Sequence, residues 1–162
     1  PSAITRMVDM GVPGYLVASS VNGVLAQRLV RTICKRCKQK TNLPASVLAD
    51  ASIPAEVAAV AEFSKGKGCP YCSKSGFRGR IGIYELMMVG GKLREMMFRA
   101  KSSIELRDEA IRQGMTTLYC DGIRKVIRGI TTLEEVYRVS KRTEIEDIAL
   151  SKVFSEFVGV KS

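Results

Sequence analysis

Hydrophobic positions near the start of the chain follow the spacing of an amphipathic helix. Within residues 2–10, the apolar side chains that share one helical stripe are Ala3, Ile4, Met7 and Val8. Gly11 follows at a place where a helix end favours a residue with left-handed backbone conformation. We therefore expect a short helix that ends before residue 11.

Residues 10–27 carry no charge over 18 positions, which is long enough for a short membrane-spanning helix. Pro13-Gly14, Ser19-Ser20 and Asn22-Gly23 interrupt this stretch. Each pair breaks or weakens a helix at a point where lipid would offer the backbone no hydrogen-bond partner. The pattern therefore favours a buried helix followed by a buried strand over a membrane span.

Two later stretches predict strands. Residues 24–33 are rich in branched side chains, and residues 81–89 form a mostly apolar run that ends at Gly90-Gly91. Between them, residues 41–63 are rich in alanine and predict one modest helix. In the first strand, the apolar side chains expected on one side of the extended chain are Leu25, Leu29 and Ile33.

From residue 92 onward the pattern is helical. Capping-box signatures, in which Ser or Thr precedes Glu by three positions, occur at Ser102/Glu105, Thr131/Glu134 and Thr143/Glu146. Short capped helices in succession predict a small bundle. The segment from residue 143 fits either a further packed helix or a partner-binding tail. Its expected apolar stripe comprises Ile145, Ile148, Ala149, Val153 and Phe157.

Two C-x-x-C pairs are the strongest chemical signal in the chain. Cys34, Cys37, Cys69 and Cys72 supply four sulfurs from two tight turns, and the sequence contains no His, so a metal site here has to be all-cysteine. Four thiolates favour structural zinc in a closed shell with no open position for catalysis. A rubredoxin-like iron site, redox dithiols and disulfides remain alternatives. Cys120 has no partner in this pattern, and we expect it to be a small helical residue or a free thiol rather than a ligand or nucleophile.

Basic residues crowd these pairs. The chain has 26 Lys and Arg against 16 Asp and Glu, and no acidic residue occurs in residues 28–40 or 64–80. Nearby cations favour the thiolate form of cysteine that a metal requires. The same cations suit a subunit interface, an anionic membrane surface or a solvated face. Nucleic acid is disfavoured because only 6% of residues are aromatic and none is Trp.

A catalytic centre is not recognisable in the chain. The missing His excludes imidazole acid–base chemistry and Ser/His or Cys/His nucleophile pairs. Neither a phosphate-binding G-x-x-x-x-G-K-[ST] loop nor a G-x-G-x-x-G motif occurs. We therefore expect the chain by itself to be inactive as an enzyme.

Several longer runs resemble the later part of the type II secretion and type IV pilus assembly ATPases, the GspE/PilB family. The resemblance covers about residues 1–142 in the same order and includes both cysteine pairs. The other runs that carry it are residues 3–11, 16–20, 24–31, 76–86, 114–118, 121–126 and 129–136.

The resemblance implies an α+β, mostly helical fold in four parts. Residues 1–33 would be the C-terminal end of a RecA-like ATPase domain, and residues 34–80 a tetracysteine metal-binding lobe. Residues 81–142 would form a final strand and a C-terminal helical lobe, a small helical bundle. Residues 143–162 extend past the matched part as an unassigned C-terminal helix or tail.

The function that the resemblance implies is that of a hexameric motor. It would hydrolyse ATP, work in the cytoplasm at the bacterial inner membrane and dock on platform proteins that assemble a pilus or a secretion apparatus. The family's phosphate-binding loop lies upstream of the matched part, so ATP and Mg²⁺ would bind only in a full-length protein. A zinc-ribbon module that binds nucleic acid is the alternative function.

The resemblance also suggests roles for individual residues. The four paired cysteines match the family's metal ligands, and the ion would be structural Zn²⁺. The arginines that match recurrent family positions are Arg28, Arg31, Arg78 and Arg80. We expect them either at subunit contacts or beside nucleotide, with structural pairing to the metal lobe as an equal alternative.

Overall fold

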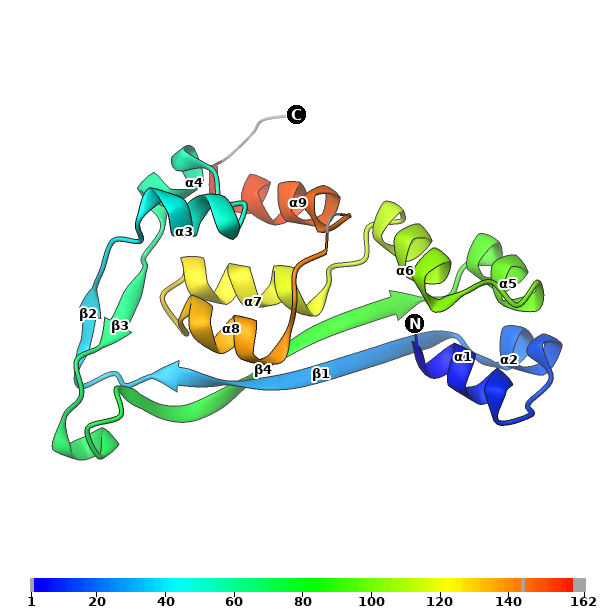
Figure 1. Cartoon of the computed structure of the whole chain (residues 1–162), viewed down its shortest axis with the longest axis horizontal. Helices are drawn as coiled ribbons and strands as arrows, with labels where there is room; N and C mark the ends of the chain where they lie inside the picture. Colours follow the sequence, from blue (N-terminus) through cyan, green and yellow to red (C-terminus); the bar gives the residue numbers. More distant parts are fainter. Residues whose placement is uncertain (1, 144, 159–162) are drawn as a thin grey trace.

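A long antiparallel ribbon forms the spine of the molecule (Figure 1). The computed structural model describes residues 2–143 and 145–158, and the fold is mixed α+β with about half of its residues in helices. Strand β1 (Gly23–Ile33) pairs with β4 (Phe77–Met88) in a register that joins Gly23 to Met88 and Arg31 to Arg80. Both predicted strands are therefore present, and β4 begins four residues before the expected start.

Helices cluster at one end of the ribbon and along one side of it (Figure 1). The helices at the end are α1 (Ser2–Asp9), α2 (Gly14–Ser20) and α5 (Gly91–Phe98). Those along the side are α6 (Ser103–Arg112), α7 (Leu118–Ile127), α8 (Leu133–Val139) and α9 (Glu146–Val158). None of the described helices is both long and apolar enough to cross a bilayer.

The opposite end of the ribbon carries the cysteine pairs and an inserted segment. A second, short ribbon joins β2 (Lys38–Lys40) to β3 (Ser64–Gly66), and a 3₁₀ turn spans Pro70–Cys72. Between β2 and β3, residues 41–63 form two helices, α3 (Ala45–Asp50) and α4 (Ala55–Val60), where the sequence predicted one. Ser52 separates them with a φ of 53°, which a continuous helix does not allow.

The strand that the sequence predicts to be buried, β1, is buried on one face only. Leu25 and Leu29 are 64% and 42% exposed, whereas Val30 on the other face is fully buried. The pairing shifts between Arg31 and Ile33, where β4 carries one extra residue, and Ile33 is buried beyond this bulge. The helices cover only one face of the ribbon, so apolar side chains on the other face remain exposed.

Helix α7 lies at the centre of the core. Its side chains Tyr119, Cys120 and Ile123 are at most 1% exposed, which agrees with a structural role for Cys120. Helix α9 packs against α4, α6 and α7, as a packed helix rather than a free tail. Leu150 and Phe154 are buried there, whereas Ile148, expected on the apolar stripe, is half exposed. Residues 159–162 of that segment lie outside the described residues.

The predicted helix caps are confirmed in part. Ser102 and Glu105 form a reciprocal capping box at the start of α6. Thr131 does not cap α8, because that helix begins one residue later, after Thr132. The Thr131 hydroxyl instead donates to the main-chain carbonyl of Arg31 at 2.7 Å, which connects α8 to β1.

Candidate metal centre

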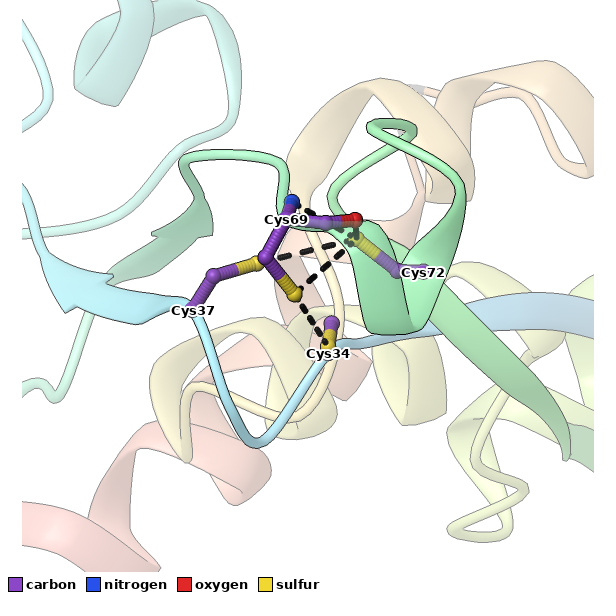
Figure 2. A group of neighbouring side chains, drawn as sticks. All are labelled: Cys34, Cys37, Cys69 and Cys72. Carbon is purple, nitrogen blue, oxygen red and sulfur yellow. Dashed lines mark hydrogen bonds between the residues drawn. The ribbon is translucent and has the colours of Figure 1, made fainter.

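The four paired cysteines converge at one point (Figure 2). Their Sγ atoms all lie within 4.8 Å of one another, and none is in a disulfide. The Sγ–Sγ separations are 3.9 Å for Cys34–Cys69, 3.8 Å for Cys37–Cys72 and 3.7 Å for Cys69–Cys72. A tetrahedral ion with metal–sulfur bonds of about 2.3 Å requires sulfurs about 3.8 Å apart. The cluster therefore has the dimensions of a four-thiolate metal site.

Two tight turns, or knuckles, present the sulfurs. In the first, the Cys37 amide donates to the Cys34 carbonyl at 3.2 Å, and in the second the Cys72 amide donates to the Cys69 carbonyl at 3.1 Å. Gly66 and Gly76 bring the backbones around them together, since a Cβ on Gly66 would lie 2.0 Å from the Gly76 carbonyl oxygen. The sequence reasoning missed this pair, although glycines spaced around a C-x-x-C motif are a usable signal.

Two backbone amides donate hydrogen bonds to the sulfur of Cys72. The amides of Cys69 and Gly76 donate to Cys72 Sγ at 3.2 and 3.3 Å. Burial raises the pKa of this thiol, but these hydrogen bonds outweigh burial and lower the pKa of Cys72 to about 6. Burial dominates at Cys37 and raises the pKa of its thiol to about 12. The backbone amides thus favour the thiolate form of Cys72, and a bound cation would favour ionisation of the other three thiols.

Arg31 links β1, three residues before the first cysteine, to helix α8. Its main-chain amide and its guanidinium donate to the carboxylate of Glu135 at 2.7–2.9 Å, and its guanidinium lies 4.3 Å from the Phe77 ring. Glu135 is 2% exposed and also accepts from Arg138. Burial raises the pKa of Glu135, but the bonds from both arginines prevail and hold it at about 2. Sequence reasoning missed Glu135 because it lies 104 positions from Arg31.

The other three predicted arginines occupy separate positions. Arg80 lies opposite Arg31 across the ribbon and makes no ion pair with a described residue. Arg28 is exposed and donates to the neighbouring carbonyl of Gln27 at 3.0 Å. Arg78 donates to the main-chain carbonyl of Tyr71 and stacks on its ring. The four arginines do not form one cluster, and only Arg31 pairs with an acid.

Comparison with known proteins identifies relatives over most of the chain. The sequence profile described as "Type II/IV secretion system protein" matches residues 1–138. A type IV pilus assembly ATPase PilB of Myxococcus xanthus is 40% identical over 137 residues, which are 84% of this chain and 24% of that protein. Type II secretion system protein E of Pseudomonas aeruginosa is 41% identical over 139 residues, 86% of this chain and 27% of that protein.

A third relative extends the same result. Type II secretion system ATPase E of Vibrio cholerae is 38% identical over 143 residues, 87% of this chain and 27% of that protein. The chain thus spans about a quarter of the length of these curated relatives. With a profile match over most of its residues and relatives at about 40% identity, the chain belongs to the type II/IV secretion system protein family.

Proposed function

We propose that this chain is part of a cytoplasmic motor ATPase, peripheral to the bacterial inner membrane, that powers type II secretion or type IV pilus assembly. The observation that carries the proposal is the match of residues 1–138 to the family, with relatives named as ATPases of both systems. In this proposal the full-length protein forms a hexamer, binds ATP and Mg²⁺ outside this segment, and docks on inner-membrane platform proteins.

Within that motor, the segment supplies a metal-stapled structural element. Cys34, Cys37, Cys69 and Cys72 would hold Zn²⁺, which would supply four bonds that cross-link the two knuckles and no catalytic position. The sulfur separations of 3.7–3.9 Å support this assignment. A rubredoxin-like iron site would use the same four thiolates, and zinc is proposed because it has no redox chemistry, which suits a purely structural role.

The proposed metal site is connected to the helical part of the chain through the strand that precedes it. The Arg31–Glu135 contact and the Thr131 hydrogen bond to Arg31 tie the strand that leads into Cys34 to helix α8. A rigid knuckle attached at this point would transmit movement between subunits to the helices. In the proposal, Arg28 and Arg80 are on the surface for subunit contacts, and Arg31 serves structural pairing.

The test uses Cys69→Ser in the full-length protein, with Cys120→Ala as the matched control. Cys69→Ser should lose bound zinc, measured per chain by elemental analysis, and should fail to restore secretion or pilus assembly in a strain that lacks the native protein. Cys120→Ala changes a buried cysteine outside the cluster and should keep both.

Two results would contradict the proposal. If the Cys69→Ser protein retains pilus assembly or secretion, the metal site is not required for the function of the motor. ATP turnover by the 162-residue chain alone would show that the nucleotide chemistry does not depend on the rest of the protein, since we expect none.

A further inference from the structure

A basic hollow lies beside the two knuckles, where β1, β4 and the loop after α7 meet. Its volume is about 560 Å³, and Tyr71, Thr32 and Gly129 contribute to its wall. No carboxylate is among the described residues that line it. The four cations that line it are Lys35, Arg36, Lys38 and Arg78. We propose that this hollow binds a phosphate group.

Arg78 is fixed in place before any ligand arrives. Its guanidinium donates to the Tyr71 carbonyl oxygen at 2.5 Å, and its own carbonyl accepts from the Thr32 hydroxyl at 2.5 Å. The bulge in β4 at this point depends on Gly79, whose φ is +85° and whose Cβ position lies 3.2 Å from the Thr32 hydroxyl. An arginine held at both ends loses little conformational entropy when it binds an anion.

Arg36 is held by the same aromatic ring. The guanidinium carbons of Arg36 and Arg78 each lie 3.9 Å from the centroid of Tyr71. Stacking orients the planar guanidinium groups and leaves their N–H groups available for hydrogen bonds. A planar guanidinium binds phosphate oxygens through two parallel hydrogen bonds, so an arginine whose plane is already oriented suits a phosphate group.

These cations are not neutralised by the protein. None of the four forms an ion pair with a described residue, although most arginines on α6 to α9 do. Clustered positive charge without acids raises the local concentration of anions. Neutralising the metal-bound thiolates explains why cations gather in this region, but it does not explain why two of them are oriented on one ring at the wall of a hollow.

The test measures phosphate binding by the zinc-loaded 162-residue chain. Inorganic phosphate is titrated against chloride at constant ionic strength, and amide shifts are followed by NMR. We expect saturable shifts around Arg36, Tyr71 and Arg78. R36Q/R78Q should raise the Kd for phosphate at least five times as much as the control K40Q/K65Q does. The control has the same change in charge, and it removes two exposed cations of the β2–β3 ribbon that lie outside the hollow.

Zinc content per chain shows whether a variant that binds phosphate weakly is still folded around its metal site. If R36Q/R78Q loses zinc, R36Q replaces it, since Arg36 makes only the ring contact among the side-chain interactions of the described residues. The proposal is overturned if neither phosphate nor phospholipid gives saturable binding. It is also overturned if the hollow variant and the K40Q/K65Q control weaken binding to within a factor of five of each other.

A second arm distinguishes the source of the phosphate. Vesicles of phosphatidylglycerol are compared with phosphatidylcholine vesicles in co-sedimentation. Binding to phosphatidylglycerol that fails in the hollow variant but persists in K40Q/K65Q assigns a lipid headgroup, and shifts with inorganic phosphate alone assign a free phosphate compound. A DNA duplex that binds tighter than either, with equal loss in both double variants, would replace the proposal with a nucleic-acid surface.

Discussion

The knuckle region and the helical region of this chain are held together in different ways. The knuckle region, residues 34–40 and 64–80, buries no apolar side chain other than those of Cys34 and Cys72. The helical region, residues 91–158, buries a continuous core that includes Leu106, Ile123 and Leu150. In our proposal the first region depends on a metal held by its four cysteines, whereas the second region depends on hydrophobic burial.

Charge divides the two regions in the same way. None of the nine Lys and Arg residues of the knuckle region forms an ion pair with a described residue. In the helical region, ten of the thirteen described cations do. Paired cations belong to the folded helical structure, and unpaired ones remain available to thiolates, to phosphate or to a neighbouring subunit. Basic residues in the described part of the chain thus have different surroundings in the two regions: most are paired with acids in the helical region, and none is in the knuckle region.

Metal removal should have the largest effect and should separate the two regions. A tetracysteine site contributes on the order of 10 kcal/mol of folding free energy, so a strong chelator should unfold the knuckles. Hydrogen exchange should accelerate strongly at the amides of Lys67 and Gly76 and little at that of Ile123. Equal loss of protection in both regions would mean that the knuckles and helices form one cooperative unit.

A core truncation should give the reverse pattern. Ile123 is fully buried, so Ile123→Ala should lower the free energy of unfolding by about 2–5 kcal/mol in a denaturant titration. Bound zinc should stay unchanged while the native state persists. Ile104→Ala, at a position 70% exposed, is the control and should change stability by about 0.5 kcal/mol or less. Loss of zinc from folded Ile123→Ala protein would show that the knuckle region is not independent of the helical core.

The contact between Glu135 of the helical region and Arg31, on the strand that leads into the knuckle region, should have the smallest effect. Glu135→Gln removes a charged acceptor of Arg31 and Arg138, and should cost about 1–3 kcal/mol because both arginines are half exposed. The pKa of Glu135 is about 2 in the fold, below its ordinary 4.5. Its contribution is therefore present above pH 4.5 and is lost as the pH falls toward 2.

The measurement compares the pH dependence of the two proteins. The unfolding free energy of the native chain should approach that of Glu135→Gln as the pH falls from about 4.5 to about 2. Arg138→Gln, which leaves the Arg31 contact in place, should have the milder effect of the two variants. A constant difference between native and Glu135→Gln protein across that pH range would exclude the ion pair as the stabilising contact.

Local patterns in the sequence predicted most elements but not which faces they bury. The strands and the short capped helices followed from spacing and capping residues, as at Ser102 and Glu105. Leu25 and Leu29 share one side of a strand that was expected to be buried, but they are exposed because the helices cover the other ribbon face. Val30 is buried because α7 and α8 pack on its side.

The candidate site was also predictable only in part. The C-x-x-C spacing and the absence of His specified four cysteine sulfurs, since tight turns with two thiols each suffice to build a tetrahedral shell. Glu135 could not be predicted as the partner of Arg31, because 104 intervening residues leave the contact undetermined by any local pattern. The same holds for the shared contact of Arg36 and Arg78 with one ring.

The sequence by itself therefore determined the four candidate ligands, the family and most of the elements, because these depend on residue type and on spacing within one or two turns. Only the tertiary structure decided which ribbon face is open, which cations are neutralised and where a basic hollow forms. Those properties depend on distances between residues far apart in the chain, and packing sets such distances only when the whole fold closes.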